Sequence, residues 1–220
     1  WRRVERLDAA MLTTTPINRP LFLVGWILAA LCSLFIAGAF FHYPSDFGSV
    51  YGARANISGA PFGFILGAVT GLLFGLPQWI LLRRFIRQAR RWLLTTSIGL
   101  GIIHSLGDAF PFAQYLIGAT VLGAVVMSVM QRRLLRGVVT QPNMWLVASI
   151  AGWVLGYLLA MRLLTASGLL LRPWEPNLGA LQHAVFGSVQ GLVYALITGT
   201  ALMWQRRESS PVAAVEQSNA

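Results

Sequence analysis

The chain has 220 residues, of which 56% are hydrophobic and only 11% are charged, and its mean hydropathy is +0.64. Soluble domains carry about 25% charged residues, so a water-soluble globule of this composition could not cover its surface with polar groups. The net charge of +10 comes from arginine, since the sequence has no lysine, and no basic soluble domain is present to bind nucleic acid. The composition therefore predicts an integral membrane protein.

Six stretches are long and apolar enough for membrane helices, because the hydrocarbon core requires roughly 20 mainly apolar residues. In chain order they are residues 20–42, 61–82, 92–110, 112–130, 145–164 and 181–204. Asp108 and Pro111 divide the third from the fourth, and we interpret the first as a membrane helix rather than a cleaved signal. We therefore predict an all-α protein with a cytoplasmic segment at 1–19, a six-helix transmembrane domain at 20–204 and a disordered cytoplasmic tail at 205–220.

Arginine is distributed unevenly between the two ends of these predicted helices. Arg54, Arg162 and Arg172 fall on one side of the membrane. All the other arginines fall in the N-terminal segment, after the second and fourth stretches, or in the tail. Cytoplasmic loops are enriched in basic residues, so this distribution predicts that both termini are cytoplasmic.

Polar and aromatic residues recur at the inner ends of the predicted helices. Trp92, Trp145 and Trp204 fall there, and we expect their indole rings in the headgroup region of the bilayer. Gln78 and Gln131 lie at a similar depth, and we expect their amides to join neighbouring helices.

One segment of the sequence occurs twice. Residues 78–99, QWILLRRFIRQARRWLLTTSIG, align without a gap with residues 131–152, QRRLLRGVVTQPNMWLVASIAG. Shorter matches extend the repeat, because GWIL at Gly25 resembles GWVL at Gly152, and QRR recurs at Gln205. We therefore predict three tandem helical hairpins of the same orientation, related by an axis along the membrane normal. The alternative is that membrane helices resemble one another through composition alone.

Glycines spaced four residues apart predict where helices pack closely. Small residues allow two helix backbones to approach each other, which favours association inside lipid. The glycines in question are Gly67, Gly71, Gly75, Gly152, Gly156, Gly187 and Gly191. They are expected to pack helices of this chain together or to form an interface with a partner protein.

Five ionisable residues fall in the outer half of the predicted membrane domain: His42, His104, Asp108, Arg162 and His183. Charges inside a membrane are costly and often functional. Asp108 and Arg162 could form an ion pair between helices, or one of the histidines could ligate the metal of (bacterio)chlorophyll or haem. A third alternative is that the set lines a path for protons or a substrate.

The glycine-spaced run leading into PQWILLRR, the later GWVLG and the closing GSVQGLVYALITGTALMW together suggest a resemblance. The chain resembles a loose group of uncharacterised bacterial multi-pass membrane proteins with repeated glycine-spaced QW…LR motifs. The likeness covers about residues 60–204 and departs from the pattern at Arg132, where tryptophan would follow glutamine. The resemblance implies a bacterial multi-pass architecture and brings no activity with it.

The sequence contains no HExxH, CxxC, Walker or Gly-x-Ser-x-Gly motif, so no enzymatic activity is expected. We expect a non-catalytic accessory or scaffold subunit of a larger photosynthetic or respiratory complex in the bacterial inner membrane. Its glycine faces and outer loops would pack against other integral membrane proteins. We also expect bound lipids. A pigment- or haem-binding subunit and a small transporter or channel are the alternatives.

Overall fold

A computed structural model describes residues 18–40, 60–84, 86, 88–109, 113–136, 138–168 and 176–205. The described part of the chain is all-α. Its six helices are α2 (Arg19–Phe40), α4 (Ala60–Leu82), α5 (Arg90–Ala109), α6 (Ala113–Leu135), α7 (Pro142–Ala166) and α8 (Pro176–Gln205). For the described residues, the expectation of an all-α protein with six helices is therefore confirmed.

Several helices extend further than their hydropathy predicts. α6 continues to Leu135, and α8 begins at Pro176. Arg132 and Arg133 occupy the last turn of α6, where their charge is favourable beside the partial negative charge of a helix C-terminus. Proline is well suited to the first position of α8, because that position needs no N–H donor. The apolar stretch alone marks only the part of each helix that lipid could surround.

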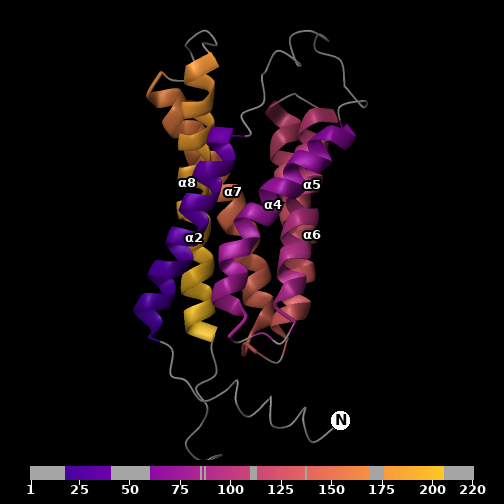
Figure 1. Cartoon of the computed structure of the whole chain (residues 1–220), viewed down its shortest axis with the longest axis vertical. Coiled ribbons are helices and arrows are strands. Elements are labelled where there is room, and N and C mark those ends of the chain that lie inside the picture. The colour runs from indigo at the N-terminus through magenta and orange to yellow at the C-terminus, as the bar shows by residue number, and fades with distance from the viewer. Residues whose placement is uncertain are drawn as a thin grey trace, which may run out of the picture.

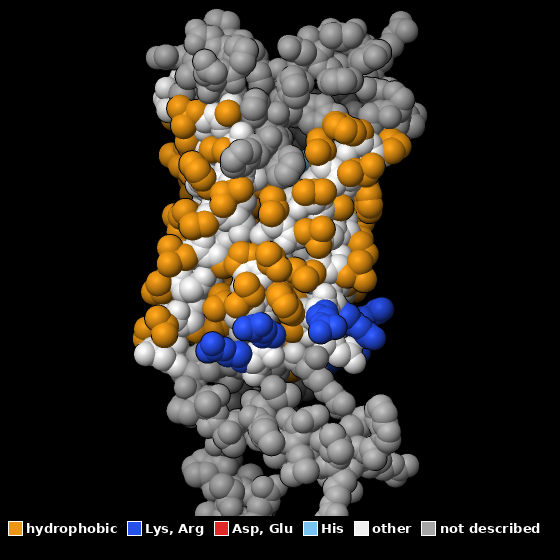
Figure 2. All heavy atoms as spheres, viewed as in Figure 1, with side chains coloured by type: hydrophobic (Ala, Val, Ile, Leu, Met, Phe, Trp, Pro, Cys, Tyr) orange, Lys and Arg blue, Asp and Glu red, His pale blue; other side chains and the backbone are white. Residues whose placement is uncertain are grey.

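Four of the helices are long and apolar enough to cross a membrane: Arg19–Ala39, Ala60–Leu82, Pro142–Ala166 and Ala180–Gln205. α5 has a similar length but carries Thr95, Thr96, Ser97 and His104, which lower its hydropathy. The chain therefore has the helices of a membrane protein with several spans. Figure 2 shows apolar side chains over the body of the molecule and arginines in a band at one end.

The six helices form a closed ring in which each packs against the next in sequence, and α8 returns to pack against α2 (Figure 1). The α2–α4 and α6–α7 contacts are the least extensive of this ring. The ring therefore consists of two groups of three helices, α4–α5–α6 and α7–α8–α2. α2 begins at Arg19 and α8 ends at Gln205. Both of these helix ends lie at the same end of the bundle as the α4–α5 and α6–α7 turns.

The closest helix contacts are made at glycines. A Cβ atom added at Gly71 of α4 would lie 2.5 Å from Ser97 Cα of α5, and one at Gly156 of α7 would lie 2.9 Å from the Gln190 carbonyl oxygen of α8. The other glycines singled out by spacing likewise face a neighbouring helix of this chain, and these are Gly67, Gly75, Gly152, Gly187 and Gly191. These glycine faces are therefore occupied within the chain, which is the first of the two alternatives that their spacing predicts.

Candidate functional site

Three tryptophans from three different helices meet in the interior of the bundle. Trp26 of α2 lies with its ring centroid 6.2 Å from those of both Trp92 of α5 and Trp145 of α7, and the latter two are 5.3 Å apart. All three side chains are 0% exposed. The expectation that Trp92 and Trp145 lie in the headgroup region is therefore wrong. A position near a helix end does not distinguish the lipid-facing side from the side that faces the other helices.

The position of Trp26 also corrects the predicted register of the first helix. If Gly25 were equivalent to Gly152, the residue matching Trp145 would be Asn18. Asn18 instead caps the N-terminus of α2, where its side-chain oxygen accepts a hydrogen bond from the Leu21 backbone N–H at 3.2 Å. Trp26 is the residue of α2 that joins Trp145, so the GWIL and GWVL segments are not structurally equivalent.

The segment repeated in the sequence forms the same local structure twice. Leu82 and Ile86 are buried in the first copy, and their counterparts Leu135 and Val139 are buried in the second. The Ile86 N–H donates to the Leu82 carbonyl at 2.9 Å, and the Val139 N–H donates to the Leu135 carbonyl at 3.2 Å. The described residues of the two copies therefore share these two buried positions and this backbone hydrogen bond.

Buried polar side chains near the three tryptophans join neighbouring helices. Trp92 Nε1 donates to Gln78 Oε1 at 2.9 Å, Gln131 Nε2 donates to Thr96 Oγ1 at 3.1 Å, and Trp26 Nε1 donates to Thr198 Oγ1 at 3.0 Å. These bonds link α5 to α4, α6 to α5, and α2 to α8. Amide, hydroxyl and indole groups are neutral at any physiological pH, so the cluster can hold helices together without a side chain that gains or loses a proton in that range.

The second copy of the hinge repeats the residues of the Gln78–Trp92 pair without the hydrogen bond. Gln131 Oε1 and Trp145 Nε1 are an acceptor and a donor, both buried, and neither has a hydrogen-bond partner in the described part of the chain. Trp153 Nε1 and both side-chain polar atoms of Gln205 are buried in the same way. Buried polar atoms without a hydrogen-bond partner among the described residues also occur on α4 and α5, at Gln78 Nε2 and Ser97 Oγ, so both halves of the ring contain them.

A second group of aromatic side chains lies in the interior beside the cluster of Trp26, Trp92 and Trp145. The rings of Phe74, Trp153 and Tyr194 lie 5.1 to 5.6 Å apart by centroid, and all three side chains are buried. The Tyr194 hydroxyl lies beside Ser149 and Thr198. The interior is thus filled by large side chains along this part of the bundle.

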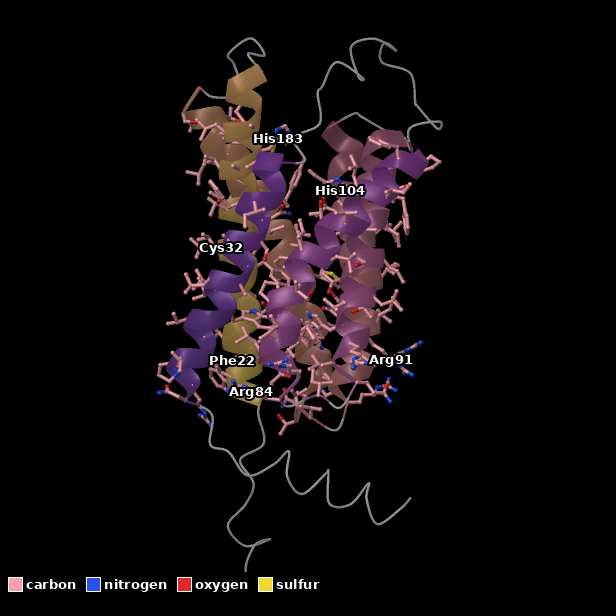
Figure 3. The ribbon with its side chains drawn as sticks, in the orientation of Figure 1. Phe22, Cys32, Arg84, Arg91, His104 and His183 are labelled. Carbon is pink, nitrogen blue, oxygen red and sulfur yellow. The ribbon has the colours of Figure 1, made fainter. Side chains whose placement is uncertain are left out.

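Two of the three histidines lie in the described part, at the end of the bundle opposite Arg84 and Arg91 (Figure 3). His104 is on α5 and His183 is on α8, and both are half-buried. Figure 3 places both at this end, although α5 and α8 are not neighbours in the ring. His42 lies outside the described residues.

The predicted ion pair between Asp108 and Arg162 stays a prediction. Asp108 lies in α5, but its side chain is outside the described part of the structure. Arg162 is exposed on α7. Within the ring, α5 packs against α4 and α6, whereas α7 packs against α6 and α8.

Sequence reasoning missed Trp26, Thr96 and Thr198 as members of the polar cluster. The sequence did carry one signal for the cluster as a whole, the separation between a glutamine and a later tryptophan. This separation is 14 residues for Gln78 and Trp92 and again for Gln131 and Trp145. Only the first of these two pairs forms a hydrogen bond across its turn. No such signal marks Trp26, because its partners are far away in the sequence.

In the described residues, no three His, Cys, Asp or Glu side chains are grouped so that they could hold a metal ion. Comparison with known proteins found no matching protein family, no matching curated protein and no matching solved structure. The class that the fold defines is an all-α membrane protein with several spans.

Proposed function

We propose that the chain is a multi-pass protein of the bacterial cytoplasmic membrane, with six spans arranged as three tandem hairpins and both termini in the cytoplasm. Two features support this orientation. Arg84 and Arg91 lie at the end of the bundle where α2 begins and α8 ends (Figure 3). The arginine band borders the apolar surface directly, as the positive-inside rule requires for a cytoplasmic face (Figure 2).

Within that membrane, the chain acts as a non-catalytic accessory or scaffold subunit of a larger complex. The observation that carries this proposal is that buried polar side chains are used to bridge helices, as Gln78 and Trp92 do. Such bonds fix the arrangement of helices without creating a reactive site. A rigid bundle of this kind is suited to holding other membrane proteins in place.

Such a partner would dock on the exposed face of α6, the side turned away from the other helices. A Cβ atom added at Gly118 would meet no atom within 4 Å, in contrast to the glycines packed inside the chain. Ile117, Val121 and Leu122 beside it are exposed and apolar. A helix of another membrane protein could therefore approach the α6 backbone closely at this point.

Leucine in place of Gly118 is expected to release co-purifying membrane proteins while leaving the bundle folded, because the added side chain enters open space. The measurement is isolation in mild detergent, followed by native mass analysis and identification of the proteins retained. Gly118→Ala is the matched control and should keep them, since alanine is still small. A wild-type chain that runs as a lone monomer, or a Gly118→Leu chain that keeps every partner, would contradict the proposal.

A second candidate function, binding a haem or (bacterio)chlorophyll, is favoured by the two histidines. His104 and His183 come from helices that are not neighbours in the ring, yet both lie at the same end of the bundle (Figure 3). Neutral imidazole is a common axial ligand of haem iron. The native preparation should then show a visible absorption band that shifts or disappears in His104→Ala. A preparation without such a band, or one in which His104→Ala leaves the band unchanged, excludes an axial role for His104.

A further inference from the structure

A set of arginines lies at the end of the bundle formed by the α4–α5 and α6–α7 turns. We call it the arginine rim, and its members are Arg83, Arg84, Arg90, Arg91, Arg132, Arg133 and Arg136. All of them are exposed except Arg132, which is half-buried. Figure 2 shows arginine side chains in a band immediately below the apolar surface, and Figure 3 places Arg84 and Arg91 at this end.

The charge of the arginine rim is not balanced by the described part of the chain. Asp108 is the only acidic residue there, and it lies near the opposite end of α5. Like charges repel over about 8 Å at physiological ionic strength, and arginines that are neighbours in sequence stand closer than that. Among the described residues, the clustering is therefore unfavourable unless an anion is present.

Three details indicate where that anion would bind. Arg90 and Arg91 stand in the first turn of α5, which contains no acidic residue, and the partial positive charge of a helix N-terminus adds to theirs. Arg132 Nε is buried and has no acceptor among the described residues. The Arg83 guanidinium lies 5.8 Å from the centre of the Trp79 ring, which holds it at the edge of the apolar surface.

We infer that the arginine rim is a binding site for the phosphate headgroups of anionic phospholipids. A guanidinium group can donate two hydrogen bonds to the oxygens of one phosphate. The arginine rim therefore offers several groups that could each bind a phosphate in this way. The apolar side chains of Leu76 and Ile80 on α4 and Leu94 on α5 are exposed just above the rim, where acyl chains would lie. A lipid fits this site better than a soluble phosphate, because charge and apolar surface adjoin each other.

The test compares lipid binding to the full chain in mixed micelles containing either phosphatidylglycerol or phosphatidylcholine of the same chain length. Bound lipids are counted by native mass spectrometry. The wild type should retain phosphatidylglycerol in preference to phosphatidylcholine. Each arginine near an anionic surface contributes about fivefold in affinity, so Arg83→Gln, Arg90→Gln and Arg91→Gln together should weaken phosphatidylglycerol binding about a hundredfold. Binding of phosphatidylcholine should not change.

Arg162→Gln is the matched control, because Arg162 is an exposed arginine near the other end of α7. It should leave phosphatidylglycerol binding unchanged. If the triple variant loses its helical circular dichroism, Arg133→Gln with Arg136→Gln takes its place and should weaken binding about 25-fold by the same reckoning. Equal retention of both lipids, an equal loss in Arg162→Gln, or displacement of the lipid by inorganic phosphate at the same concentration would overturn the inference.

This inference rests on the proposed membrane embedding, and vesicle insertion separates the two failures. A chain that inserts into vesicles of both lipids but shows no headgroup preference contradicts the inference alone. A chain that stays outside vesicles of either composition contradicts the membrane proposal itself.

Discussion

Leucine in place of Gly71 is expected to destabilise the bundle by about 3 kcal/mol or more, because it enters a contact in which the α4 and α5 backbones approach each other closely. The first added atom would already lie 2.5 Å from Ser97 Cα and 2.7 Å from the Thr96 carbonyl oxygen. Overpacking a core costs about 1–3 kcal/mol when side chains can move, and here the obstacle is backbone. The two helices must therefore separate, which also strains the 2.9 Å hydrogen bond between Trp92 and Gln78 on the same pair.

The measurement is reversible unfolding of the purified chain in mixed micelles, followed by helical circular dichroism. Gly118→Leu is the matched control, because it adds the same side chain where no atom lies within 4 Å. It should change the free energy of unfolding by less than about 0.5 kcal/mol. Equal stability of the two variants would show that α4 and α5 do not approach each other as closely as the structure has them.

The positions of the helices could be predicted from the sequence because lipid imposes a simple rule. A backbone in hydrocarbon must satisfy its own hydrogen bonds, so a long apolar stretch becomes a helix. Charge and proline at Asp108 and Pro111 were enough to divide the longest run into α5 and α6. Helix ends were predicted less well, because residues such as Gln131 are polar and yet buried inside the bundle.

The direction in which each helix faces could not be predicted in the same way. α4 and α7 are apolar on nearly every side, so their sequences do not distinguish the face toward lipid from the face toward other helices. Trp92 and Trp145 look like interfacial residues by position and are buried in the structure. The closure of the ring between α2 and α8 depends on contacts between the two ends of the chain, such as Trp26 with Thr198.

The sequence singled out residues for the candidate site but not their geometry. His104 and His183 were both singled out as costly groups in lipid, and both lie at the same end of the bundle (Figure 3), while binding of a cofactor by either stays a prediction. The repeat located Gln78 and Gln131, because polar residues at constant spacing stand out in an apolar sequence. The hydroxyl partners Thr96 and Thr198 gave no such signal, since threonine is common in membrane helices and often bonds its own backbone.

Alanine in place of Trp92 is expected to destabilise the bundle by about 4 kcal/mol or more. The side chain is 0% exposed and contacts both Trp26 and Trp145. Truncating a buried tryptophan to alanine costs about 3–5 kcal/mol through lost packing and the cavity that remains. The loss also leaves Gln78 Oε1 without its donor, and an unsatisfied buried acceptor costs a further 1–3 kcal/mol or so.

The packing and hydrogen-bonding contributions can be separated by a double-mutant cycle, measured by unfolding in mixed micelles. Trp92→Phe keeps much of the ring but removes the N–H, and Gln78→Leu removes the acceptor. If the hydrogen bond is formed, the two changes together should cost less than their sum by about 0.6 to 1.7 kcal/mol, the range found for such bonds inside membranes. Trp204→Ala is the control, because that side chain is 82% exposed and should be nearly neutral. Strict additivity of the pair, or equal losses for Trp92→Ala and Trp204→Ala, would contradict a tryptophan-centred core in which α4 and α5 are joined by Gln78.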